Sequence, residues 1–549
     1  MRALVLGVGT GLLVTAASAQ AIQVLPDRAD PALVTRSLPV PRSEPVTAPT
    51  PVRTATPPAA RVALVGTIRP ARIVVDGAEH LPPGMLDRVT APYAGRALSP
   101  EDLRDLAGAV AAVARASGLV LATASIQPQP LDSGALVITL DEGRIDAVRS
   151  LGTPNQQADR VLSRLVTHRG MTKRELETTL MLVGDLPGIT VVNTRYAREN
   201  GFGILLVTLA TDRVSLFAQG DNRGTDEIGP WRTTELASLR GVASAGDELG
   251  ILASQTPHDP REFEFVSGRY AWPIGRAGAV LDASAFYGTT HAGGYLRALD
   301  LTGRTYGGGI GTSVVLERSR QASLWLDVDL KALENVQRLR GRRFRDDTLS
   351  ILSGTLRTQD RIAGGSFRGG LTVSWGLPIG DTTRDGDPFA SRADGSARFV
   401  TASFEGDWRR PIAGPLSIEL AAAGQAASRP LLATAEISLG GPLFGRAYDY
   451  SERTGDEGVL GSAELQLNLG DHAGSPLPRL QLYAFADGGT VHNLQRGIGG
   501  GSLASAGGGV RLGRGQFDGG LEVGLPINAD RVDTSNKSPR VSLRLSMFL

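Results

Sequence analysis

The 549-residue sequence contains no cysteine, only three lysines, and few aromatic residues, which make up 5% of the chain. Without cysteine the chain can form no disulfide framework, no zinc finger and no thiol nucleophile. Lys173, Lys331 and Lys537 do not follow a glycine-rich loop, so no phosphate-binding P-loop is present. These absences exclude several common classes of enzyme and of small secreted domain.

The chain also has almost no net charge, with 57 basic and 56 acidic side chains and a formal charge of +1. A nucleic-acid partner is therefore not expected, because no basic excess exists to displace counterions from phosphates. The six histidines never stand four residues apart, and no Gly-x-Ser-x-Gly motif occurs. We expect no metal site, no cofactor and no catalytic residues.

No apolar run reaches the length of about 20 residues that a membrane-spanning helix needs. The first residues instead have the pattern of an export signal. Arg2 is followed by a short apolar stretch, and Ala17, Ser18 and Ala19 form a small-residue cleavage site. This pattern predicts a signal peptide over residues 1–19 and a mature protein outside the cytoplasm.

Composition divides the rest of the chain. Residues 24–61 hold nine prolines, which predicts an extended linker within residues 20–69, where only Pro31 to Ser37 could form a helical turn or two. Positions 1–212 contain 17 glycines, whereas positions 213–549 contain the other 52 and all five tryptophans. Two different kinds of structure therefore meet near residue 212.

Residues 70–143 and 144–212 read as two successive βααββ units. Ser99 and Pro100 open a predicted helix in the first unit. Thr172 and Glu175 form a capping box in the second. The sequence predicts either one α+β domain without an assigned role or a pair of binding modules whose strand edges accept an extended partner.

From residue 213 to 549 the apolar residues alternate with polar ones, as in 324–331, 463–469 and 541–549. This pattern over 337 residues favours a transmembrane antiparallel β-barrel over a soluble sandwich, because soluble domains rarely grow so large. The length fits about 16 strands of about 21 residues each, turns included. The stretches 338–347 and 381–394, rich in Arg and Asp, are predicted to be solvent-exposed loops.

Several segments resemble the two-partner-secretion transporters, the haemolysin-type secretion/activation proteins. The segment with Asp221, Asn222, Gly224 and Arg232 is similar to the opening of their barrel, and Phe485 to Gly489 is similar to their Phe-x-Asp-x-Gly strand. A further segment is similar to their inward-folding sixth loop, with the motif residues Phe444, Gly445, Arg446, Tyr448, Asp449, Gly455, Asp456 and Gly458, followed by Glu464. The resemblance implies two POTRA (polypeptide-transport-associated) modules before a barrel.

In residues 480–487 the alternating pattern places Asp487 in the barrel lumen. An arginine on a loop folded into the lumen could bind this carboxylate through a bidentate fork. The resemblance implies that Arg446 does so; from the residues alone, both side chains could equally be ordinary hydrated charges. Ala447 departs from the family pattern, in which glycine follows the arginine, so the tip of the loop is expected to differ in shape. The proline-rich stretch argues against the plug helix that the family often carries.

The resemblance implies a non-enzymatic outer-membrane transporter, with its POTRA modules in the periplasm, that exports an unfolded β-rich exoprotein. Expected partners are this exoprotein, outer-membrane lipids and the barrel assembly machinery, with no nucleic acid. Two alternatives stay open: an assembly factor that inserts other barrels, and a passive porin-like channel.

Overall fold

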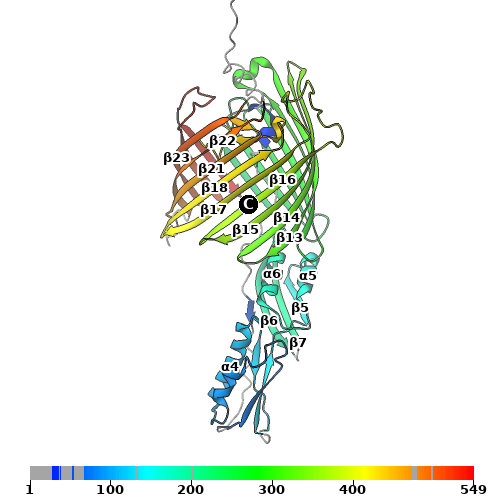
Figure 1. Cartoon of the computed structure of the whole chain (residues 1–549), viewed down its shortest axis with the longest axis vertical. Coiled ribbons are helices and arrows are strands. Elements are labelled where there is room, and N and C mark those ends of the chain that lie inside the picture. Colours follow the sequence, from blue (N-terminus) through cyan, green and yellow to red (C-terminus); the bar gives the residue numbers. More distant parts are fainter. Residues whose placement is uncertain are drawn as a thin grey trace, which may run out of the picture.

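The computed structural model describes residues 28–35, 38, 52–54, 67–130, 134–199, 202–470, 479–495 and 499–549. The predicted signal peptide and most of the predicted linker lie outside the described residues. Figure 1 shows a β-barrel with a long arm below it, formed by two small α+β units. We call residues 67–211 the arm, and the barrel end away from it the far end.

The first unit of the arm packs helices on a three-stranded sheet. Its elements are β2 Arg72–Asp76, α3 Asp87–Thr90, η1 Ala91–Tyr93, α4 Pro100–Ala116, β3 Thr123–Ser125 and β4 Ala135–Asp141, with the sheet order β2-β4-β3. The predicted helix start is confirmed: Ser99 accepts a hydrogen bond from Asp102 N at 3.1 Å, and Asp102 accepts one from Ser99 N at 2.8 Å. Leu106 and Val110 of α4 are fully buried against Ile138 of the sheet. The apolar face of α4 therefore holds this unit together.

The second unit repeats the same order. Its elements are β5 Ala147–Gly152, α5 Gln156–Leu162, η2 Ser163–Leu165, α6 Lys173–Gly184, β6 Ile189–Glu199 and β7 Phe202–Thr211. Thr172 caps α6, as the capping box predicts. A short strand from the N-terminal stretch, β1 Val52–Thr54, pairs parallel with β6 and gives the sheet order β1-β6-β7-β5. None of the helices in the described ranges is long and apolar enough to span a membrane.

The arm is fixed to the barrel by polar contacts. Arg318 of the barrel donates two hydrogen bonds of 2.7 Å to the carboxylate of Asp185, which follows α6. Gln157 in α5 donates to Gly275 O at 2.9 Å in another barrel turn. The two units of the arm are also joined, because Leu121 of the first lies in the apolar core of the second. These contacts hold the second unit of the arm against the barrel and the first unit against the second.

The barrel is closed by sixteen antiparallel strands, which confirms the predicted number. They are β8 Val214–Asp221, β9 Arg232–Arg240, β10 Glu248–Gln255, β11 Phe263–Ile274, β12 Ala279–His291, β13 Leu301–Arg318, β14 Ala322–Leu339, β15 Arg342–Ile362, β16 Gly365–Leu377, β17 Val400–Ala413, β18 Leu416–Ala427, β21 Glu457–Asn468, β22 Arg479–His492, β23 Gly501–Arg514, β24 Phe517–Pro526 and β25 Arg540–Phe548. The last strand pairs with the first, with Arg544 opposite Asp221 and Phe548 opposite Phe217.

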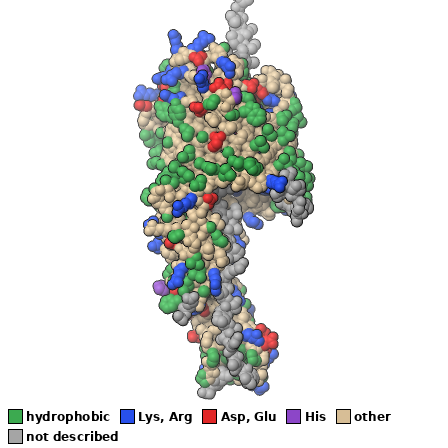
Figure 2. All heavy atoms as spheres, turned by 180° about the vertical axis from the view of Figure 1, so that it is seen from behind, with side chains coloured by type: hydrophobic (Ala, Val, Ile, Leu, Met, Phe, Trp, Pro, Cys, Tyr) green, Lys and Arg blue, Asp and Glu red, His purple; other side chains and the backbone are tan. Residues whose placement is uncertain are grey.

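The two faces of the barrel wall differ as the alternating pattern predicts. Ile310 and Leu545 point outward with 64% and 62% of their surface exposed, whereas Glu464 and Glu522 point inward and are almost completely buried. Hydrophobic side chains cover much of the outer wall in Figure 2, and basic side chains gather at the far end. An apolar belt around a polar interior is the arrangement of a transmembrane barrel.

The two predicted solvent loops are wrong in part. Residues 338–347 belong to β14 and β15, which pair up to a two-residue turn at Arg340 and Gly341, both with positive φ. The alternation is lost in the sequence there because these strands extend past the apolar belt, where both faces tolerate charge. Residues 381–394 do connect β16 and β17, but Arg392 is only 4% exposed and lies 2.7 Å from carboxylate oxygens of both Glu436 and Asp456.

The buried pair of Arg318 and Asp185 makes a testable prediction about the arm. Replacing Arg318 with alanine leaves the Asp185 carboxylate without this partner and removes two hydrogen bonds, so the arm should become mobile relative to the barrel. Spin labels at positions 88 and 321 should give one narrow distance distribution in the parent protein and a broad one in R318A. The control is R320A, which removes the more exposed ion pair between Arg320 and Glu177 and should keep the distribution narrow. An unchanged distribution in R318A would show that the pair does not fix the arm.

Candidate functional site: a loop folded into the barrel lumen

The connection between β18 and β21, residues 428–456, folds into the barrel and does not extend away from it. We call it the lumenal loop. It contains η4 Ala433–Ala435 and a small hairpin of β19 Ile437–Leu439 and β20 Arg453–Gly455. Gly440 and Gly445 have φ values of 109° and 82°, and these left-handed conformations turn the chain back on itself. The tip of the loop thereby reaches the inner faces of β21 to β24.

Asp487 of β22 holds this tip. Its Oδ1 accepts hydrogen bonds from the backbone N–H groups of Gly445 at 2.9 Å and Arg446 at 3.2 Å, and from the hydroxyl of Ser505. Its Oδ2 lies 3.1 Å from Nε of Arg446. The structure therefore brings together the two residues that the sequence analysis paired, but backbone donors supply most of the hydrogen bonds.

The Arg446 guanidinium does not form the predicted bidentate fork with Asp487, because it is shared among three carboxylates. Nη1 lies 2.6 Å from Glu464 and 3.5 Å from Glu522, and the group stacks 4.3 Å from the ring of Phe485. The sequence analysis did not assign Glu522 to this site. The alternating pattern places Glu522 on the lumenal face of β24. It cannot show whether such a carboxylate binds a loop residue or is simply hydrated.

The neighbours of Arg446 pack the tip against the wall. Tyr448 is 1% exposed, and its hydroxyl lies 3.2 Å from Ala504 O and 3.1 Å from Ala529 O. Ala447 is completely buried beside Gly524, on which a Cβ would lie 3.0 Å from Ala447 Cα. The backbone of Ala447 is not left-handed, so its methyl group is accommodated by a glycine on the facing strand. Phe444 packs at the edge of the same apolar cluster.

The second half of the loop motif anchors the base of the loop. Asp456 accepts hydrogen bonds from Arg392 and from Leu431 N at 2.7 Å each, and from Leu494 N at 2.8 Å. A Cβ on Gly455 or Gly458 would lie 2.7 Å from atoms of the adjacent strand β22. These glycines permit close approach of the loop base and the wall.

A short N-terminal helix also lies in the lumen, although the sequence analysis argued against a plug helix. It is α2 Pro31–Thr35, which is drawn dark blue inside the barrel in Figure 1. Arg28 lies 2.7 Å from Glu227 and also binds Asp449 of the lumenal loop, which Arg540 of the wall binds as well. The loop and the N-terminal segment are therefore linked through one carboxylate, that of Asp449.

The predicted barrel-start motif lies at the seam where β8 meets β25. Asp221 accepts a hydrogen bond from Arg223 N at 2.9 Å and lies 3.8 Å from Arg232. Gly224 lies against Gly229 O, where a side chain would not fit. The amide of Asn222 receives a hydrogen bond from Leu543 N at 2.7 Å and donates one to Val541 O at 3.0 Å. Asn222 thereby continues the ladder beyond the end of β8.

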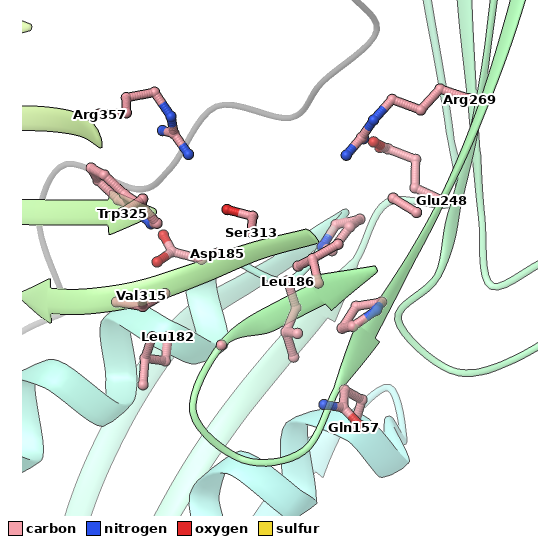
Figure 3. A pocket seen from close by; sticks show the side chains of 15 residues that line it. Gln157, Leu182, Asp185, Leu186, Glu248, Arg269, Ser313, Val315, Trp325 and Arg357 are labelled. Atoms are coloured by element: carbon pink, nitrogen blue, oxygen red, sulfur yellow. The ribbon is translucent and has the colours of Figure 1, made fainter. Parts of the chain in front are cut away.

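A cavity of about 100 Å³ lies where the arm meets the barrel. Figure 3 shows Leu182 and Leu186 of the arm on one side of it, and Trp325, Arg269 and Arg357 of the barrel wall around the other side. Among the described residues no group of three or more acidic or histidine side chains could hold a metal ion.

Comparison with known proteins gives matches of three kinds. The family model "Haemolysin secretion/activation protein ShlB/FhaC/HecB" matches residues 203–512, and the ShlB-type POTRA domain matches residues 68–143. The heme/hemopexin transporter protein HuxB of Haemophilus influenzae is 26% identical over 166 residues, which are 29% of this chain and 29% of the length of HuxB.

Solved structures with the same fold include CdiB from Escherichia coli, with a TM-score of 0.67 and 19% identity over 98% of this chain and all of that one. CdiB from Acinetobacter baumannii has a TM-score of 0.61 and 15% identity over 97% of this chain and 98% of that one. BamA from Haemophilus ducreyi, lacking POTRA domains 1–3, has a TM-score of 0.55 and 12% identity over 88% of this chain and all of that one.

Asn222 is expected to stabilise the pairing of β8 with β25, which can be tested by replacing it with leucine. The change removes two hydrogen bonds to β25, so the free energy of unfolding should fall by about 1–3 kcal/mol. When samples are heated to increasing temperatures before electrophoresis, the compact band of N222L should disappear at a lower temperature than that of the parent protein. The control is N536L, because Asn536 receives its side-chain bond from Ser538 N, only two residues away. If the compact bands of N222L and the parent protein disappeared at the same temperature, Asn222 would not stabilise the pairing of β8 with β25.

Proposed function

We propose that this chain, which belongs to the haemolysin secretion/activation protein family ShlB/FhaC/HecB, exports one or a few large β-rich exoproteins across the outer membrane. The exoprotein arrives unfolded in the periplasm, docks on the POTRA modules of the arm and passes through the lumen in extended form. The proposal is supported by three features found together: a polar lumen, an arm of two α+β units at one mouth of the barrel, and a loop and a helix inside the barrel.

Docking by strand addition fits the sheets of the arm. Both sheets have end strands, β2 in the first unit and β5 in the second, on whose outer side the described residues place no further strand. Such edges offer backbone donors and acceptors to an extended chain, whatever its side chains. The edge at β6 already carries β1 of the same chain, which is an example of the pairing that we propose for the exoprotein.

Passage through the lumen requires the lumenal loop or α2 to move, because both occupy it. Asp487 and Arg446 hold the tip of the loop, and Arg28 ties α2 to the same loop through Asp449. We propose that these contacts define a resting state, and that an arriving exoprotein replaces some of them. Folding of the emerged chain outside the cell would then make its movement directional.

The test of docking is deletion of residues 72–210, measured by the appearance of a co-expressed exoprotein in the medium. Export should be lost while the barrel still assembles, which a heat-modifiable band on a gel reports. Export at the normal level from the deletion variant would overturn the docking model. A general loss of unrelated outer-membrane barrels in the deletion strain would favour an assembly factor instead.

The arrangement around Asp487 predicts that R446A inserts normally but exports less, because a lumenal contact is lost and no lipid-facing residue changes. R446K should also export less, since a lysine ammonium cannot contact Asp487, Glu464 and Glu522 and stack on Phe485 at the same time. R511K is the matched control: Arg511 binds Glu464 and Gln481 of the wall, and no hydrogen bond or ion pair joins it to the loop tip among the described residues. Unchanged export in R446A would remove Arg446 and Asp487 from the functional site.

A further inference from the structure

The hairpin of β14 and β15 and the adjoining end of β13 present a cluster of arginines at the far end of the barrel. The cluster comprises five residues: Arg304, Arg338, Arg340, Arg342 and Arg343. We propose that this cluster, which we call the arginine rim, binds the phosphate groups of the glycolipid in the outer leaflet of the membrane. The inference rests on the outer-membrane barrel and not on the proposed export function.

Three of these arginines lie on the outward face of the wall. In β13 the alternation that makes Ile310 64% exposed also turns Arg304 outward. In β14 the outward positions run from Leu330 to Arg338 in steps of two. Arg343 of β15 lies directly opposite Arg338 in the ladder, so it shares that face.

This placement has an electrostatic cost within the protein. Like charges directly opposite each other in an antiparallel pair destabilise it, and Arg338 faces Arg343 in this way. Arg343 has one ion pair, 3.0 Å from Asp346. In the described part of the chain no carboxylate lies within 4 Å of Arg338, Arg340 or Arg342, and the nearest charge to act on Arg338 is the same Asp346 carboxylate, which two arginines therefore share. An anionic ligand above the membrane would relieve the repulsion.

The height of the cluster matches the level of lipid headgroups. Tyr287 and Tyr306 lie opposite each other on the outward face, 47% and 37% exposed, where an aromatic girdle marks the boundary of the apolar belt. Arg304 follows one pleat beyond Tyr306, roughly 7 Å further along the strand. A guanidinium at this level can bind phosphate with two parallel hydrogen bonds while the wall below contacts acyl chains.

Arg340 occupies the first position of the two-residue turn between β14 and β15 and is exposed there. Arg340 adopts φ 49° before Gly341, a conformation that arginine adopts at an energetic cost compared with glycine or asparagine. On the outward face, the three arginines of the cluster stand against two carboxylates, those of Glu334 and Asp346. The whole chain carries only +1, so this excess is local.

The test uses the full-length protein in detergent micelles, titrated with diphosphoryl lipid A and with the same lipid lacking its phosphates. The variant is R304Q/R338Q/R343Q. The control R88Q/R104Q/R149Q removes the same charge from exposed positions on the arm. The parent protein and the control should bind diphosphoryl lipid A equally, and the rim variant about a hundredfold more weakly. The phosphate-free lipid should bind the parent as weakly as diphosphoryl lipid A binds the variant.

Thermal unfolding without lipid provides a second readout. The variant removes the repulsion between Arg338 and Arg343 but also the partly exposed ion pair of Arg343 with Asp346, so its melting temperature should stay close to that of the parent protein. A lower melting temperature would mean that the arginines serve the fold, and equal lipid binding by the parent and the variant would also overturn the proposal. If the variant kept lipid binding but lost export, the rim would contact the exoprotein, and the lipid assignment would be wrong.

Discussion

Closure of the backbone ladder is the constraint on which the rest of the structure depends. A wall that crosses a membrane must satisfy every N–H and C=O group within itself, because lipid offers no partner. The sixteen strands do so by pairing β25 with β8. Where β8 ends, the side-chain amide of Asn222 takes over the pairing with Leu543 and Val541. Closure also fixes the register, and the register decides which side chains face lipid and which face the lumen.

The enclosed lumen gives charged residues a role that an apolar core would not allow. Inward-facing carboxylates such as Asp487, Glu464 and Glu522 surround one arginine of the lumenal loop. Removing these charges from water costs free energy, which is recovered only if the partners are well placed. The N–H groups of Gly445 and Arg446, fixed by the turn of the loop, provide such placement at Asp487. The position of the loop therefore follows from the wall as much as from its own sequence.

Local signals in the sequence were enough to predict the elements that depend on local physics. The caps at Ser99 and Thr172 and the alternation in residues 541–549 are such cases. Contacts between distant parts of the chain were not accessible in this way. Arg28 and Asp449 are 421 positions apart. The sequence allowed a helical turn or two at residues 31–37, but nothing in it indicated that this segment lies in the lumen. The hairpin at residues 338–347 was missed because, beyond the membrane, its strands no longer alternate between apolar and polar residues.

The composition of the contacts explains how a loop can be held firmly and still be released. The apolar cluster at the loop tip has six buried members, whereas the core of the second arm unit has seventeen. Leu431 and Leu432 at the base of the loop belong to a second small cluster. Beside these two small clusters, the loop is held by hydrogen bonds and ion pairs. Water, or the backbone of an extended chain, can replace such contacts one at a time, since each offers donors and acceptors of its own. An apolar core would have to be exposed as a whole. Hydrogen bonds and ion pairs in a hydrated lumen can therefore hold the lumenal loop inside the barrel at rest and still release it when a chain passes through.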